Sequence, residues 1–448
     1  MTKKSQPTFR YIDLFAGVGG FAAALNALGG EVRLAAEIDE LAAATYEANL
    51  GHNPRRNVID VAKNSTALGS YQVLTGGFPC QPFSKSGAQK GTSEPRGTLF
   101  GEIEKIVNGS TPLLIVLENV RNLAGPRHRE EWNRIINFLR HAGYRVASEP
   151  AEFSPHLLSK SQGGRPHHRV RIFITATYNP GPGGHNFESP PPAVTLKSGI
   201  APKWNLVSDL PLKESVDSRY GITTQERLWI EAWEKVVVRW KSEYSEKLPG
   251  FPLWSDYWLR DRPSGFESMP QWKQRFVLRN MDFYMKDRQF LDEWLENNRV
   301  REEFPNSRRK FEWQAGDLDS IWKCLIQMRP SGIRVKSPNY VPTLVALNQT
   351  PIYGPFERRI TELEAASLQG FPENWQPNPQ SSTATYKQMG NAVNIGVIAH
   401  VFREHCKRDL DVLSTSAEGR RVLEGLSNSP ENPDEVFASW GHKVRPPN

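Results

Sequence analysis

The sequence predicts an α/β fold in which a mostly parallel sheet carries a smaller inserted domain. Strand-like apolar runs alternate with helical segments from Tyr11 to about Thr177, as in a parallel sheet with crossover helices. Glycines and prolines interrupt this pattern at residues 178–184. Most tryptophans then fall within residues 195–356. We therefore divide the chain into the first part of the main domain (residues 1–178), an inserted domain (179–356), a return segment (357–407) and a polar tail (408–448).

The first expected strand runs directly into a glycine turn. Residues 11–13 are followed by Gly17, Gly19 and Gly20, and residues 21–28 form an alanine-rich helix. Glycines let the backbone approach a ligand closely, and a helix N-terminus favours polar or anionic groups. The spacing is not G-x-G-x-x-G, which disfavours a dinucleotide-dependent dehydrogenase.

Acidic residues follow the next two segments. Glu37 comes after the expected strand 32–36, and Asp60 ends a third segment that we also interpret as a strand end. Both acids should lie at the carboxyl edge of the sheet, where open α/β sheets bind ligands, and an acid after the second strand suits ribose hydroxyls. Asp39 is interpreted as structural.

Cys80 is the candidate nucleophile. An apolar strand over residues 71–74 and a Thr-Gly-Gly turn lead to this thiol, which lies between Pro79 and Pro82. A proline before the nucleophile fixes φ and removes a competing backbone donor. A free cysteine is more often buried and inert, so the case for Cys80 depends on the segments around it.

The rest of the chain supplies charged residues at strand ends and aromatic helices. Glu118 follows the apolar strand 113–117, and a strand over residues 170–176 begins beside Arg169 and Arg171. Helices are expected at residues 226–240, 288–304, 362–368 and 388–401, the first two with aromatic stripes that we assign to the core. The tail after Lys407 is polar, and partial disorder is expected there.

Composition excludes several classes of protein. The chain has 448 residues, a net charge of +7 and three cysteines. The positive charge permits a polyanionic partner. The wide separation of the cysteines argues against a disulfide framework or a zinc site. The polar N-terminus lacks a signal-peptide core, and no apolar run is long enough to span a membrane. A cytoplasmic, nucleoid-associated protein is expected.

Taken in order, these motifs resemble those of the C5-cytosine-specific DNA methyltransferases of bacterial and phage type. The resemblance covers roughly residues 11–402 apart from a variable middle. The segments that carry it are residues 13–20 (DLFAGVGG), 79–84 (PCQPFS), 96–100 (RGTLF), 118–120 (ENV), 167–171 (HHRVR), 358–361 (RRIT), 368–372 (LQGFP) and 388–393 (QMGNAV). His167 replaces the family's usual glutamine, so we expect a different hydrogen bond and a pH-sensitive protonation state there.

The resemblance implies a Rossmann-like, S-adenosylmethionine-dependent methyltransferase fold and an enzyme that methylates carbon 5 of a flipped cytosine in a specific duplex sequence. Cys80 would add to carbon 6, Glu118 would meet the ring nitrogen and exocyclic amine, and Arg169 and Arg171 would supply positive charge. S-adenosyl-L-homocysteine would be the product, and no metal is expected. Phe15 would lie near the adenine, Glu37 on the ribose and Asp60 on the adenine amino group. The full set of expected cofactor residues is Asp13, Phe15, Gly17, Gly19, Gly20, Glu37, Asp60, Pro79, Leu99 and Asn391.

Double-stranded DNA is the expected partner, and a cognate restriction endonuclease would act separately on the same DNA. Arginine bidentate to guanine is the commonest specific contact with a base, and Arg329 and Arg334 lie in an arginine- and glycine-containing segment of the inserted domain. A monomer is expected. The expected DNA-binding residues are Gln81, Ser84, Lys85, Arg329, Arg334 and Thr343.

Two alternatives remain at this stage. One is an RNA cytosine-5 methyltransferase of the same fold, against which the long middle domain argues. The other is a non-catalytic DNA-binding relative, against which the intact Cys80, Glu118, Arg169 and Arg171 count.

Overall fold

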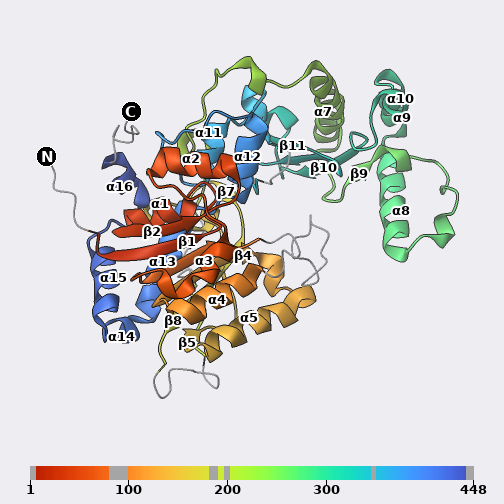
Figure 1. Ribbon diagram of the computed structural model, residues 1–448. Helices are drawn as coiled ribbons and strands as arrows, with labels where there is room; N and C mark the ends of the chain where they lie inside the picture. The colour runs from red at the N-terminus through yellow and green to blue at the C-terminus, as the bar shows by residue number, and fades with distance from the viewer. Residues whose placement is uncertain (1–6, 80–98, 181–189, 196–201, 345–349, 440–448) are drawn as a thin grey trace.

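The computed structural model describes residues 7–79, 99–180, 190–195, 202–344 and 350–439. A larger body is built from the N-terminal and C-terminal parts of the chain, and a smaller body is built from the middle (Figure 1). Four predicted site residues, Cys80, Gln81, Ser84 and Lys85, lie outside the described residues.

The larger body contains the predicted α/β sheet, with strand order β2-β1-β3-β4-β8-β5 and β6 paired to β8. The strands β2, β1, β3 and β4 run parallel, whereas β8 is antiparallel to β4, β5 and β6. Among these strands only β8 therefore opposes the others, which confirms a mostly parallel sheet. The strands are β1 (Phe9–Leu14), β2 (Gly30–Ala36), β3 (Val73–Gly77), β4 (Leu114–Val120), β5 (Tyr144–Val146), β6 (Ala151–Phe153) and β8 (Arg171–Tyr178).

Helices cover both faces of this sheet (Figure 1). Successive strand residues enter different apolar cores, as Tyr11 and Ile12 do, because side chains alternate across a strand. Such strands are apolar on both sides, which is typical of parallel sheets. One core includes α1 (Gly20–Ala27) and α13 (Ile395–Arg408), and the other includes α3 (Val58–Lys63), α4 (Leu99–Ser110) and α5 (Arg129–His141). The helix α2 (Glu40–Leu50) follows β2.

The return segment corrects one expectation. Helix α11 (Glu362–Leu368) forms as predicted, but the expected helix 388–401 is interrupted between α12 (Ser382–Asn391) and α13. The Gln369 amide donates to the carbonyls of Met389 at 2.6 Å and Ala392 at 3.3 Å, while Asn394 caps α13. Asn391 therefore ends one helix and does not lie near the start of the next.

The prediction of a partly disordered tail is wrong for residues 410–439. They form α14 (Leu410–Leu413), α15 (Ala417–Ser427) and α16 (Pro433–Ser439). Leu413, Val422 and Phe437 join the core beneath α1 and α13. Arg165 also holds Asp434 through two hydrogen bonds of 2.7 and 2.8 Å. A few well-spaced apolar residues thus anchor a segment whose overall composition is polar.

The smaller body has its own sheet, with strand order β15-β14-β11-β12-β10-β9. Trp233, Trp240 and Trp294 are buried, as the aromatic stripes predict. The expected helix 288–304 divides at Arg299, which has a φ of 46°. The strands are β9 (Leu253–Trp254), β10 (Lys310–Gln314), β11 (Leu325–Arg329), β12 (Gly332–Lys336), β14 (Ile352–Tyr353) and β15 (Arg358–Arg359), and the helices are α7 (Thr224–Tyr244), α8 (Gln271–Lys286), α9 (Arg288–Asn297) and α10 (Val300–Glu303).

A short parallel pair joins the two bodies. β7 (His167–His168) in the larger body pairs with β13 (Val341–Pro342) from the middle of the chain. This pair lies next to Arg169 and Arg171 in sequence. The inserted segment is therefore attached beside the carboxyl edge of the main sheet, where the predicted site residues gather.

Candidate active site at the carboxyl edge of the sheet

The glycine turn after β1 adopts left-handed backbone conformations. Phe15, Gly17 and Gly19 have φ values of 56°, 54° and 92°. A Cβ atom at Gly20 would lie 2.6 Å from the carbonyl oxygen of Val393. The absence of a side chain at Gly20 thus lets the segment after Asn391 pack directly against this turn, so motifs far apart in sequence meet here.

Glu37 ties the second strand to the glycine turn. Its carboxylate accepts hydrogen bonds from the backbone N–H of Gly17 at 2.8 Å and of Asp39 at 2.7 Å. Asp39 in turn caps α2 by accepting from Leu41 and Ala42, which is the structural role expected for it. Glu37 is therefore fixed at the edge of the sheet.

Asp60 does not lie at a strand end. It occupies the first turn of α3, where its carboxylate pairs with Lys63 at 2.9 Å on the surface. Val58 begins a helix here because the Asn57 side chain caps the N–H of Ile59. The prediction of a third strand was wrong because this short apolar run fits either element.

Exposed apolar side chains near these acids were missed by sequence reasoning. Ile38, between Glu37 and Asp39, is 71% exposed, and Leu41 and Ile59 are also exposed. An isoleucine flanked by two acids was the available signal. Such uncovered aliphatic surface beside hydrogen-bonding groups suits the flat face of a nucleobase.

Three more of the expected cofactor residues differ in how far they are buried. Leu99 begins α4 and packs partly against the core below it, and Pro79 is half-buried after β3. Asn391 is exposed at the end of α12. No contact that the structure describes joins these three side chains, so their shared role stays a prediction.

Asp13 is fully buried beneath the glycine turn. The Thr75 hydroxyl donates to Oδ1 at 3.0 Å, while Oδ2 has no hydrogen-bond partner among the described residues. Burial raises the pKa of this carboxyl to about 8; the hydrogen bond from Thr75 acts against this rise, and the negative charge of Glu37 adds to it. Because Asp13 has no exposed surface, it supports the glycine turn from below.

This burial predicts a pH-dependent stability. Because the folded-state pKa of Asp13 is about 8 and its ordinary value is 3.8, the unfolded chain loses this proton first as the pH rises. The free energy of unfolding should fall by about 1.4 kcal/mol per pH unit between these values and level off above pH 8. Asp13→Asn should lack this decline. Urea titrations from pH 5 to 9 measure the difference. Parallel curves would contradict it, and Asp60→Asn controls for the loss of a surface carboxylate.

Glu118 and Arg171 form the centre of the site. Glu118 lies on β4 opposite Gly77 of β3, and Arg171 begins the neighbouring strand β8. Arg171 Nε lies 2.9 Å from Glu118 Oε1, and both side chains are largely buried. Burial raises the pKa of Glu118, while the charges of Arg171 and Arg169 act in the opposite direction. The result is a carboxyl that holds its proton to higher pH than an ordinary glutamate.

Asn119 is a second residue that sequence reasoning did not select, although it stands in the quoted Glu-Asn-Val motif. Its amide donates to the carbonyl oxygen of Phe78 at 3.2 Å, and its own oxygen accepts from the N–H of Val120. Asn119 therefore links the end of β4 to the backbone two residues before Cys80.

Arg169 and Thr343 meet where the inserted segment joins the larger body. Arg169 is buried and donates to the carbonyl of Leu344 at 3.3 Å. The Thr343 hydroxyl donates to the carbonyl of His168 at 2.7 Å. Thr343, from the middle of the chain, is thus held one residue from Arg169, a juxtaposition that the sequence could not establish.

His167 corrects another expectation. Its ring lies between the Leu368 carbonyl, 3.3 Å from Nδ1, and the Leu344 N–H, which donates to Nε2 at 3.4 Å. Burial and the nearby Arg169 lower the pKa of His167 well below its usual range. A neutral imidazole serves both contacts, so the pH-sensitive protonation expected here is not borne out.

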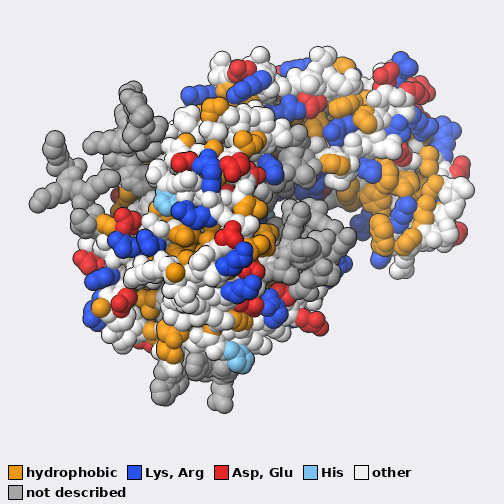
Figure 2. All heavy atoms as spheres, in the orientation of Figure 1, with side chains coloured by type: hydrophobic (Ala, Val, Ile, Leu, Met, Phe, Trp, Pro, Cys, Tyr) orange, Lys and Arg blue, Asp and Glu red, His pale blue; other side chains and the backbone are white. Residues whose placement is uncertain are grey.

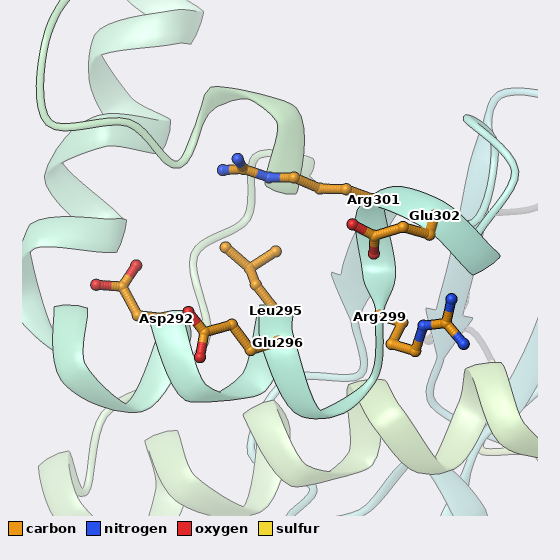
Figure 3. Close-up of a pocket in the computed structure, with 6 residues that line it drawn as sticks. All are labelled: Asp292, Leu295, Glu296, Arg299, Arg301 and Glu302. Carbon is orange, nitrogen blue, oxygen red and sulfur yellow. The ribbon is translucent and has the colours of Figure 1, made fainter.

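Arg329 and Arg334 lie on the sheet of the smaller body and both pair with Glu312, at 2.6 and 2.9 Å. Around this sheet, Figure 2 shows basic and apolar side chains gathered over α8. A hollow of about 490 Å³ opens beside α9 and α10 (Figure 3). None of the predicted site residues lines it; its lining residues are Asp292, Leu295, Glu296, Arg299, Arg301 and Glu302.

The described residues contain neither a cluster of metal ligands nor a membrane-spanning helix. No group of three or more His, Cys, Asp or Glu side chains among them could hold a metal ion. No helix in the described part of the chain combines the length and apolar character needed to cross a lipid bilayer.

Comparison with known proteins gives a consistent result. The model of a family described as C-5 cytosine-specific DNA methylase matches residues 9–407. The Type II methyltransferase M.AluI of Cellulosimicrobium cellulans is 39% identical, over 98% of this chain and 99% of its own. The Type II methyltransferase M.HpaII of Haemophilus parainfluenzae is 27% identical, over 94% of this chain and 90% of its own.

Proposed function

The chain belongs to the family of C-5 cytosine-specific DNA methylases, and from this we propose that it methylates carbon 5 of a flipped cytosine through a covalent bond from Cys80 to carbon 6. DNA cytosine-5 methylation itself follows from the family. The observation that supports the mechanism is the buried pair of Glu118 on β4 and Arg171 on β8, because β4 lies beside β3, the strand that leads to Cys80.

The chemistry requires both a thiolate and a proton donor. Carbon 5 of cytosine is a poor nucleophile, and addition of the Cys80 thiolate to carbon 6 turns it into the nucleophilic end of an enamine. Negative charge develops on the ring nitrogen during this addition, and Glu118 offers it a proton or a hydrogen bond. Burial raises the pKa of Glu118, which favours its protonated form, and Arg171 holds the carboxyl in place. Once carbon 5 carries the methyl group, water takes the carbon 5 proton, the carbon–sulfur bond breaks, Cys80 leaves as a thiolate and the ring nitrogen returns its proton to Glu118.

The residues around the glycine turn fit S-adenosylmethionine, the methyl donor of this family. It supplies the methyl group that carbon 5 receives. Glu37 is fixed beside the turn, where its oxygens suit ribose hydroxyls, and the exposed Ile38 offers aliphatic surface to the adenine. Phe15, Gly17 and Asn391 would complete this pocket, with Asp13 supporting it from below.

DNA would bind between the two bodies. Carbon 6 is inaccessible inside a stacked duplex, so the target base must be flipped out. Thr343 lies at the junction of the bodies and would contact the DNA there, while the buried Arg169 beside it would supply positive charge to the site. We also propose that the protein acts as a monomer in the cytoplasm, since one chain carries both bodies, and that a restriction endonuclease shares its target.

A duplex with 5-fluorocytosine at the target position tests the covalent step. After addition and methylation, carbon 5 of this base carries fluorine in place of a proton, so the elimination that frees Cys80 cannot occur. We expect a protein–DNA complex that survives denaturing electrophoresis, forms only with S-adenosylmethionine and does not form with Cys80→Ala. Methylation of an ordinary duplex without any such complex would contradict covalent catalysis, and activity on RNA alone would favour the RNA enzyme.

A further inference from the structure

One face of the sheet in the smaller body is polar although the sheet is central to that body. Ile333 and Val335 of β12 point into the apolar core, so Arg334 and Lys336 point to the opposite face. Glu312 of β10 lies directly opposite Arg334, and Gln327 of β11 lies opposite it on the other side. These residues form one continuous polar surface across three strands.

Glu312 is the centre of this surface. Its Oε2 atom accepts from Arg329 Nη2 at 2.6 Å and from Arg334 Nε at 2.9 Å, and its other oxygen accepts from the Gln314 amide. The Glu312 side chain is only 14% exposed. Breaking a largely buried ion pair is costly, so the carboxylate fixes both guanidinium groups.

The two arginines use different guanidinium nitrogens to bind Glu312. Arg329 uses a terminal nitrogen for Glu312, and Arg308 donates to its carbonyl oxygen. Arg334 uses only Nε, and its two terminal nitrogens donate no hydrogen bond to any described residue. Arg334 is also the more exposed of the two, at 30% against 19%. Its free end is the fork that fits the two acceptors of guanine, O6 and N7.

The same surface leads to the active site. Lys336, two residues beyond Arg334 on the same face, lies 5.5 Å from the centre of the Tyr340 ring, which stacks against His168. His168 immediately precedes Arg169. Burial and the nearby Arg334 lower the pKa of Lys336, as expected where cations are crowded. A polyanion bound beside His168 would therefore also meet Lys336 and Arg334.

We propose that Arg334 reads a guanine in the target sequence and that Glu312, supported by Arg329, is the positioning residue that orients it. This inference rests on the proposed function, because it assumes that duplex DNA occupies the junction of the two bodies. It assigns Arg334 as the base-contacting residue and gives Arg329 a supporting role. It also requires the target sequence to contain guanine.

The test uses duplexes that carry the target sequence, with each guanine replaced in turn by 7-deazaguanine, which lacks the N7 acceptor. Wild-type protein should lose kcat/KM by about tenfold at one of these guanines, the lower part of the range for one bidentate contact. Arg334→Lys keeps the charge but not the fork, so it should be weaker on the normal duplex and insensitive at that same guanine. Glu312→Gln should also be weaker on the normal duplex and insensitive at that guanine. Its lower kcat/KM should come from a higher KM for DNA rather than from a lower kcat.

Controls separate positioning from folding. Glu246→Gln removes a surface partner of Lys286 in the same body and should leave KM and the 7-deazaguanine profile as in the wild type. Glu312→Asp should recover part of the sensitivity that Glu312→Gln loses. A wild-type protein that is insensitive at every guanine, or a Glu312→Gln variant with the wild-type profile, would overturn the proposal. Absence of methylation by the wild type would instead contradict the proposed function.

Discussion

Replacing Cys80 with alanine should reduce methyl transfer to duplex DNA by roughly 10⁴-fold or more, as loss of a catalytic nucleophile does in other enzymes. Without the thiolate, carbon 5 of cytosine remains a poor nucleophile, and the remaining residues have no bond to form at carbon 6. Transfer of tritium-labelled methyl groups to plasmid DNA measures the loss. Binding of S-adenosylmethionine, measured by calorimetry, should persist.

The two other cysteines provide matched controls for this experiment. Cys324 and Cys406 are both buried, and burial raises the pKa of the Cys324 thiol to about 12 and that of Cys406 above its ordinary value. Neither forms a thiolate at neutral pH, so Cys324→Ala and Cys406→Ala should retain methyl transfer. Activity that survives in Cys80→Ala, or disappears in either control, would show that another group is the nucleophile.

Glu118→Gln should lower kcat by about 10²- to 10⁴-fold, the usual contribution of a general acid or base. Glutamine keeps the volume and can still donate a weak hydrogen bond, but it cannot transfer a proton as charge develops on the cytosine ring. Steady-state kinetics at saturating DNA and S-adenosylmethionine measure the change. Glu152→Gln is the matched control: Glu152 lies on β6 of the same sheet, and its exposed carboxylate pairs with Arg121.

The sign of the pH dependence follows from the environment of Glu118. Burial raises its pKa in the folded protein, so the protonated form is present below that raised value and is lost as the pH rises through it. The wild-type kcat should therefore decline on the alkaline side, and Glu118→Gln should lack that decline. An identical alkaline limb in both proteins would assign the decline to a different group.

The sequence placed Glu37 and Glu118 correctly at the carboxyl edge of the sheet because they lie at strand ends. Glu37 and Glu118 follow apolar runs long enough to identify as strands, and parallel strands bring such ends to one edge of the sheet. The same reasoning placed Asp60 wrongly at a strand end, because the residues before it form a helix turn capped by Asn57. A short apolar run does not distinguish the two elements.

The remaining differences arise from contacts between distant residues. Gln369 stabilises the break between α12 and α13, and Arg165 anchors the C-terminal helix α16 through Asp434. Neither partner can be identified from local composition. The pairing of Arg334 with Glu312 across β10 and β12 likewise depends on strand register, which the sequence did not reveal. Local patterns predicted the elements, whereas these long-range contacts required the structure.

Base-resolution bisulfite sequencing of DNA from a methylation-free host that expresses this chain measures cytosine-5 methylation and its dependence on Cys80 in one experiment. We expect methylated cytosines in one short recurring sequence that contains guanine, and none in the same host expressing Cys80→Ala. Soluble wild-type protein that binds S-adenosylmethionine and yet leaves every cytosine unmethylated would contradict it.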